Sequence, residues 1–192
     1  MRYTHGFKSP AGEFNYDKVR LNVSKRMKMG PLGNGYFSVT GEKIFGVLPY
    51  PLLAVPLGNQ SAIYAPVNFN LLRFGEFVTD QYASIQYRQN LEGLFVNRLP
   101  LIQKLKWRLL ATANVLVGSL SQANEDLIPP PSTGGLKYEA FALQPGKPYV
   151  ELGYGVENIF KIFRIDFIHR LDYLEIPNAR SFGVFFTAQI QL

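Results

Sequence analysis

The sequence predicts an all-β protein, an antiparallel transmembrane β-barrel of about eight strands, standing alone or forming the C-terminal part of a larger barrel. Three observations support this fold class. Apolar and polar residues alternate over segments of roughly ten residues or more. Short and long connections follow one another along the chain. Phenylalanine and tyrosine, which favour strands, occur 15 and 11 times.

Each predicted strand is a segment in which apolar and polar residues alternate with period two. Residues 1–9 form the tail of a preceding strand, and the alternating segments after it are 16–26, 36–45, 79–91, 107–118, 149–158, 163–172 and 182–192. Strands of about 9–11 residues cross a bilayer when they are tilted, whereas ordinary globular strands are shorter. The strand lengths therefore favour a membrane barrel.

The connections between these strands differ in length. Those at 27–35 and 158–162 are short, 175–180 is fairly short, 94–106 is intermediate, and 47–76 and 119–147 are long. Residues 33–35, Gly-Asn-Gly, are a hairpin signal. If the long loops share one end, the chain finishes at the short-turn end, which is the layout of outer-membrane barrels. Prolines interrupt the charge-free interval 44–72, so we expect no transmembrane helix there.

Length and composition limit the classes of protein to consider. The 192 residues fit a single domain, assigned to the whole of 1–192, and a hydrophobic content of 47% excludes a disordered chain. The sequence has no cysteine, and His5 and His169 are far apart, so we expect no metal and no cofactor. The net charge of +6 is dispersed without basic-aromatic clusters, which indicates no nucleic-acid partner.

The orientation of the strand faces separates two architectures. In a membrane barrel the apolar face meets lipid and the polar face lines the lumen, whereas a soluble barrel or sandwich turns its apolar face inward. The polar faces here carry glycine, small polar residues and charges of both signs, which suits a crowded lumen. Aromatic residues stand toward the ends of the apolar faces, as interfacial girdles do: Phe37, Phe45, Tyr87, Trp107, Phe163 and Phe182. We therefore predict apolar faces that point outward.

Several motifs add a resemblance to a known family. They are Phe69-Asn70-Leu71-Leu72 and the runs at 30–33, 41–53, 58–60, 76–82, 97–101 and 153–161. Together they resemble the C-terminal barrel portion of a Bacteroidota outer-membrane family of unknown function, over most of 10–192. More distantly, the closing hairpins resemble surface-antigen barrels of the outer-membrane assembly type. The resemblance implies an upstream carboxypeptidase-regulatory-like β-sandwich, which is not catalytic. This sequence shows neither the β-sandwich nor an export signal, so we expect it to be a C-terminal piece of a longer protein.

A charged network on the polar faces is the main candidate site. Charged residues of the segment 163–172 share one strand face, with opposite charges on other strands. Such a set either gates or selects ions in a pore or pairs buried charges between strands, and we favour the pairing. The predicted network comprises Arg20, Glu42, Arg108, Glu151, Arg164, Asp166, Arg170 and Asp172.

The last strand carries a second candidate site. Its alternation up to a hydrophobic end resembles the signal that outer-membrane assembly machinery reads, although leucine stands where an aromatic residue is commoner. The same residues also suit a last lipid-facing strand. They are Phe182, Val184, Phe186, Ile190 and Leu192.

The loop 47–76 is proline-rich and has no charge before Arg73. Such a loop is too apolar to extend into water, so it would plug the lumen, contact a partner or pack on the barrel rim. We predict the rim.

These features predict an integral protein of the cell outer membrane with a structural, transport or assembly-related role and no catalytic activity. The expected partners are outer-membrane lipid, the assembly machinery during insertion, and an unidentified surface or periplasmic protein. One alternative is a soluble lipocalin-like barrel that binds an apolar ligand. Another is an outer-membrane hydrolase using carboxylates such as Glu151 and Glu157, although no histidine or nucleophile lies near them in sequence.

Overall fold

A long antiparallel sheet forms most of the protein. The computed structural model describes residues 1–8, 14–94, 96, 103–128 and 140–188. Helical structure in this part of the chain is limited to α1 (Gln122–Glu125) and short 3-10 turns. The all-β prediction is therefore confirmed. The strands are β1 (Arg2–Gly6), β2 (Tyr16–Lys28), β3 (Asn34–Phe45), β4 (Phe77–Val78), β5 (Gln81–Asn90), β6 (Arg108–Ser119), β7 (Phe141–Ala142), β8 (Tyr149–Ile159), β9 (Phe163–Arg170) and β10 (Phe182–Ala188).

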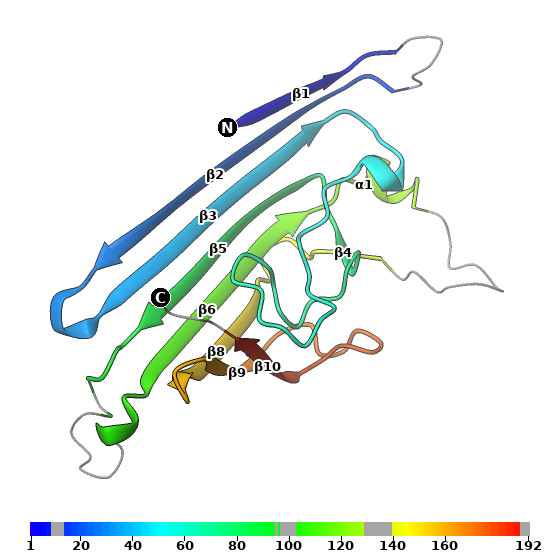
Figure 1. Cartoon of the computed structure of the whole chain (residues 1–192). Helices are drawn as coiled ribbons and strands as arrows, with labels where there is room; N and C mark the ends of the chain where they lie inside the picture. Colours follow the sequence, from blue (N-terminus) through cyan, green and yellow to red (C-terminus); the bar gives the residue numbers. More distant parts are fainter. Residues whose placement is uncertain (9–13, 95, 97–102, 129–139, 189–192) are drawn as a thin grey trace.

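The strands follow one another across the sheet almost in chain order. Eight of them join in the order β1-β2-β3-β5-β6-β8-β9-β10, and all neighbouring pairs are antiparallel. The short strands β4 and β7 form a separate parallel pair. Connections after β3, β6 and β9 therefore leave the sheet at one end, called here the loop end, and those after β2, β5 and β8 leave it at the turn end (Figure 1). This arrangement is the predicted one.

The sheet is not closed into a barrel in the described part of the chain. No pairing there joins β1 to β10. The edge of β10 instead contacts the connection 47–76, called here the loop. Phe186 N–H donates to the Ala62 carbonyl at 2.9 Å, and Tyr64 N–H donates to the Phe186 carbonyl at 3.3 Å. Because these backbone groups of β10 already have partners, they are not available to a closing strand. The structure thus contains a curved, open sheet (Figure 1), and the predicted barrel, whether complete or the C-terminal part of a larger one, stays a prediction.

The two faces of the sheet differ in polarity and in exposure. The inner face carries polar residues that are buried, such as Thr40 and Asn114, which are 7% and 4% exposed. The outer face carries apolar residues that are exposed, such as Val39 and Ile85, at 38% and 50%. Adjacent residues on one strand point to opposite faces, so this contrast follows directly from the period-two pattern. The predicted orientation of the faces agrees with the structure.

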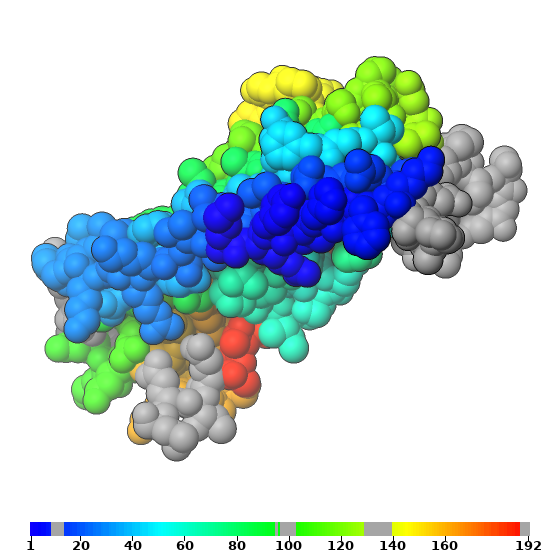
Figure 2. All heavy atoms as spheres, turned by 90° about the horizontal axis from the view of Figure 1, so that it is seen from above, coloured from blue at the N-terminus to red at the C-terminus, as the bar shows by residue number. Residues whose placement is uncertain are grey.

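The hydrophobic core lies on the inner face near the loop end. There the strands supply Ile44, Leu116 and Tyr149, and the connections supply apolar side chains that pack on them. The contributing residues from the connections are Leu48, Leu53, Ala54, Phe69, Leu72, Leu143, Tyr173 and Ile176. The loop 47–76 extends farther than the predicted rim, because part of it crosses the inner face and reaches β10; in Figure 2 the teal part of this loop lies against the red end of β10.

Candidate functional site: the inner face and its loop

Glu151 of β8 fixes the loop to the centre of the inner face. Its side chain accepts hydrogen bonds from the backbone N–H groups of Asn70 at 2.9 Å and Leu71 at 2.8 Å. It also accepts from the Tyr149 hydroxyl at 2.7 Å and the Asn114 amide at 3.3 Å. Glu151 is only 1% exposed, so these donors replace the water that a carboxylate otherwise needs.

A buried ion pair lies next to this anchor. The Arg170 guanidinium of β9 is 2.7 Å from the Glu76 carboxylate, and both side chains are 0% exposed. Arg170 also donates to the backbone carbonyls of Asp172 at 2.9 Å and Tyr173 at 2.8 Å, and it lies over the Tyr149 ring. Because Glu76 is the last residue of the loop, this ion pair attaches the loop to β9 of the sheet.

The third contact between the loop and the inner face involves an ion pair within β9. Arg164 and Asp166 share the inner face and form two parallel hydrogen bonds of 2.6 Å each. The Tyr64 ring from the loop covers the Arg164 guanidinium at 4.4 Å. Burial raises the pKa of the Tyr64 hydroxyl. The opposite charges of Arg164 and Asp166 thus balance each other, and the loop covers this ion pair.

Two further carboxylates have their partners outside the loop. Glu42 lies among the first strands of the sheet, and Glu157 lies toward the turn end of β8. Glu42 of β3 is 2.7 Å from the Lys18 ammonium and 3.7 Å from Arg20, and it accepts from the Tyr82 hydroxyl at 3.1 Å. Glu157 of β8 accepts from the Asn90 amide at 2.6 Å and is 3.6 Å from the Arg108 guanidinium. These contacts join strands of the main sheet, with Asn90 of β5 reaching Glu157 of β8 across β6, and they do not involve the loop.

The predicted network is thus present as separate groups. The structure brings together Arg20 with Glu42, Arg108 with Glu157, and Arg164 with Asp166. Four members differ from the prediction of pairing between strands. Arg164 and Asp166 pair with each other within β9. Arg170 pairs with a loop carboxylate, and Glu151 accepts mainly from backbone and hydroxyl donors. Asp172 contributes a backbone carbonyl, and its side chain forms no ion pair with any described residue.

Sequence reasoning missed the residues that the loop contributes. Glu76 and the backbone of Asn70 and Leu71 lie far from β8 and β9 in the chain, so alternation gives no sign of their contact. A cue was available: Arg73 and Glu76 are the first charges after a long neutral interval, and an acid that follows such an interval is a candidate partner for a lumen arginine.

The terminal strand is only partly visible. Phe182 and Phe186 are exposed on the outer face, and Val184 between them is half-buried on the same face. Ile190 and Leu192, the other residues of the predicted assembly signal, lie outside the described residues.

The inner carboxylates are occupied by donors, as described above. No group of three or more potential metal-ligating side chains occurs among the described residues. His169 lies on the outer face, where its ring contacts Tyr154 and Phe182. Among the residues that the structure describes, no helix is long and apolar enough to span a membrane.

A comparison with protein families gives one match. Residues 1–123, more than half of the chain, match the C-terminal domain of a family of unknown function, DUF5686. The chain belongs to this family. The DUF5686 match includes β1 to β6 and the whole loop 47–76, and it ends before β7 and β8. The resemblance predicted from the sequence motifs extended over most of 10–192. No curated protein and no solved structure matches the chain.

Proposed function

We propose that the chain forms the wall of an outer-membrane β-barrel with a structural, transport or assembly-related role and no catalytic activity. The observation that carries this proposal is the reversed polarity of the sheet. Its buried face holds charges and amides, and its exposed face holds large apolar side chains such as Ile85, Leu152 and Phe186. Water disfavours such an exposed face over a whole sheet, whereas lipid favours it.

The loop on the inner face supports a filled lumen at this part of the wall. Three contacts hold it there: Glu151 with the backbone at residues 70 and 71, Arg170 with Glu76, and Arg164 with Tyr64. Each contact buries a charge that has a close partner, which is the condition under which charges persist inside a protein. We infer that the loop is a fixed internal plug.

The open edges of the sheet bear on how a barrel would close. A strand edge in lipid would leave backbone N–H and C=O groups without partners, at a cost of several kcal/mol each. The outer edge of β1 pairs with no described strand. We therefore propose that further strands pair with β1, so that this sheet is the C-terminal part of a larger barrel, which closes on β10 through backbone groups other than those of Phe186.

Localisation and partners follow from the same proposal. The protein would reside in the cell outer membrane with lipid against the outer face. The assembly machinery would act on β10 during insertion, since this strand presents Phe182 and Phe186 outward. The loop end would offer a contact to a surface or periplasmic protein.

The sidedness of the sheet weighs against the soluble alternative. A lipocalin-like barrel holds its ligand against an apolar interior, but the interior-facing residues here include Ser84, Gln86 and Asn114. The hydrolase alternative is weakened by the inner carboxylates, because Glu151 accepts four hydrogen bonds and Glu157 faces Asn90 and Arg108. Neither arrangement leaves a carboxylate free to act as general acid or base.

Lipid contact can be tested with single cysteines, because the chain has none of its own. We expect a fluorescent label on the Ile85→Cys variant in vesicles to be quenched by a spin label carried on lipid acyl chains. A label on Leu105→Cys, equally exposed at 48% but in the connection after β5, serves as the matched control and should stay bright. A folded, detergent-free protein in buffer, with neither label quenched, would contradict the proposal.

A further inference from the structure

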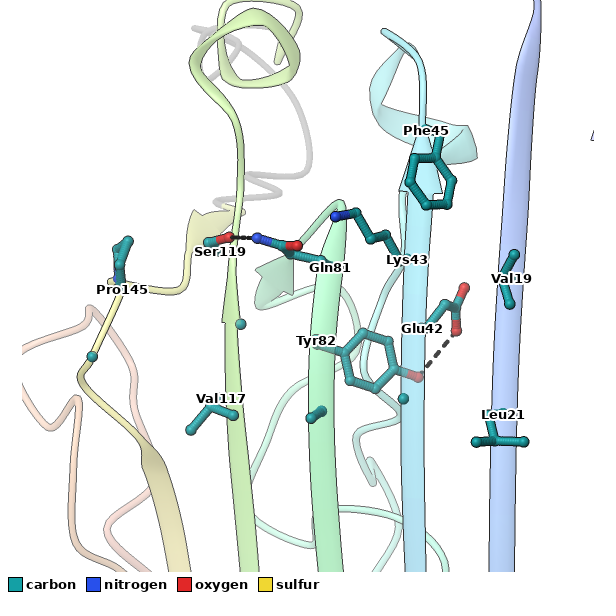
Figure 3. Close-up of a pocket in the computed structure, with 14 residues that line it drawn as sticks. Val19, Leu21, Glu42, Lys43, Phe45, Gln81, Tyr82, Val117, Ser119 and Pro145 are labelled. Atoms are coloured by element: carbon teal, nitrogen blue, oxygen red, sulfur yellow. Dashed lines mark hydrogen bonds between the residues drawn. The ribbon is translucent and has the colours of Figure 1, made fainter. Parts of the chain in front are cut away.

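A hollow of about 690 Å³ lies on the outer face of the sheet. It spans β2, β3, β5 and β6 near the loop end, and its apolar lining includes Leu21, Phe45 and Val117. Figure 3 shows Leu21 and Val117 on opposite sides of the hollow. Its volume is within the range of small-molecule sites, and it lies on the face that would meet lipid.

Small side chains in one cross-strand row create the hollow. In register across the sheet stand Leu21, Gly41, Ala83 and Val117, so that two small residues separate two large ones. A β-carbon added at Gly41 would find nothing within 4 Å, which shows that the space above it is open. Pro145, from the connection before β8, adds a wall at the side of β6 (Figure 3). The result is a trough rather than a flat sheet surface.

The end of the trough toward the loop end is polar. The next row of the register places Lys43 beside Gln81, which bonds to Ser119 at 2.8 Å. Lys43 is exposed on the outer face, and its ammonium lies 5.1 Å from the centre of the Phe45 ring. No carboxylate of the described residues forms an ion pair with it. A cation without an anionic partner therefore stands where an apolar trough meets its polar rim.

We propose that the trough binds a membrane phospholipid with a net negative headgroup. One acyl chain lies along Gly41 and Ala83, and the phosphate contacts the Lys43 ammonium. The apolar length and the single cation at one end match the two parts of such a lipid, and lysine near a membrane surface attracts anionic headgroups. This inference rests on the proposed function, because it requires lipid at the outer face.

Tryptophan quenching by brominated lipid tests the proposal. Trp107 is the only tryptophan, so Trp107→Phe gives a silent background in which Phe45→Trp reports on the trough. Phe182→Trp is the matched reporter, since it lies on the outer face and also at the loop end. In phosphatidylcholine vesicles with a minor fraction of brominated phosphatidylglycerol, we expect about fivefold enrichment of that lipid at the first reporter relative to the second.

Three further variants, each made in the Phe45→Trp background, separate the parts of the site. Lys43→Gln should reduce the enrichment to the bulk value, and Gly41→Leu, which fills the trough, should do the same. Lys25→Gln removes the same charge from the outer face near the turn end and should leave the enrichment unchanged. Brominated phosphatidylcholine should quench the two reporters alike in every variant.

The outcomes distinguish the lipid site from the membrane proposal. If both reporters are quenched to the same extent by brominated phosphatidylglycerol, the trough has no preference and the lipid site is wrong, although the outer face meets lipid. If neither reporter is quenched by either brominated lipid in folded protein, the outer-membrane function fails and the lipid site fails with it.

Discussion

At the scale of single residues, the inner face is held together by charges with closely placed partners. Glu151 and Arg170 are the two that connect the loop to the sheet. A buried charge loses its hydration, so its stability depends on each remaining partner. The consequence is asymmetric: removing one side of a contact costs more than removing both.

Glu151→Gln should weaken the attachment of the loop. The glutamine side chain keeps the shape but has a single acceptor oxygen, so at least one of the backbone N–H groups of Asn70 and Leu71 loses its partner. We expect the free energy of unfolding to fall by about 1–3 kcal/mol in urea titrations of the folded protein. Glu175→Gln, in an exposed pair with Lys147, is the control and should change little. Equal effects of the two substitutions would refute the role of Glu151.

Arg170→Met should be more harmful than Arg170→Met combined with Glu76→Met. The single variant leaves the buried Glu76 carboxylate with Arg73, whose Nε lies 3.3 Å away, as its remaining arginine partner, at a cost of up to about 3–5 kcal/mol. The double variant removes that carboxylate as well. A double-mutant cycle with Glu76→Met measures the coupling. Simple additivity of the two substitutions would show that the pair contributes no interaction energy.

At the scale of elements, the loop has two functions in the fold. Its middle part covers polar groups of β8 and β9, and its segment at 62–64 pairs with the edge of β10. Pairing shields a strand edge from other strands. The position of this segment thus decides whether β10 is available to a closing strand.

A disulfide can test whether the loop segment occupies the β10 edge. Ile63 and Phe186 lie opposite each other in an isolated parallel β-bridge between the loop and β10. Ile63→Cys with Phe186→Cys should therefore cross-link readily on mild oxidation in a chain without other cysteines. Non-reducing gels would show the faster band. Ile63→Cys with Phe182→Cys is the control, because four residues of strand move the partner by about 13 Å. Equal cross-linking of both pairs would mean that the segment does not rest at this edge.

At the scale of the whole molecule, the distribution of polarity is the reverse of that in a water-soluble sheet. Large apolar side chains line the outer face, and the buried charges lie on the inner face, several of them beneath the loop. Surface substitutions of a soluble protein change stability by at most about 0.5 kcal/mol. A lipid-facing surface responds differently, because a charge there must leave water.

Ile85→Lys therefore distinguishes a lipid-facing from a water-facing surface. Ile85 is exposed in the middle of β5, and we expect a loss of about 2–4 kcal/mol in the free energy of folding into vesicles. Denaturant titrations of reversible insertion give this value. Leu105→Lys, outside the strands, should be nearly neutral. A neutral Ile85→Lys would argue that water, not lipid, covers the outer face.

The alternating pattern was enough to predict the long strands of the main sheet and their faces, because consecutive residues of a strand must point to opposite sides. It did not predict the short parallel pair β4 and β7. Val39 and Thr40 illustrate this: their neighbouring positions place one on each face, as the structure has them. Pairs such as Arg164 and Asp166 were also within reach, since a spacing of two residues puts them on one face. The partner of Arg170 was not predictable, because Glu76 comes from a loop whose path no local pattern encodes.

The sequence by itself determined the all-β class, the positions of the long strands and the side on which each residue stands, since these depend on local geometry repeated along the chain. Only the tertiary structure decided that the loop crosses the inner face, that Glu151 holds its backbone, and that the edge of β10 pairs with residues 62–64. Those contacts join segments that are far apart in the chain. They form because buried charges and open strand edges must find partners wherever the fold brings donors and acceptors together.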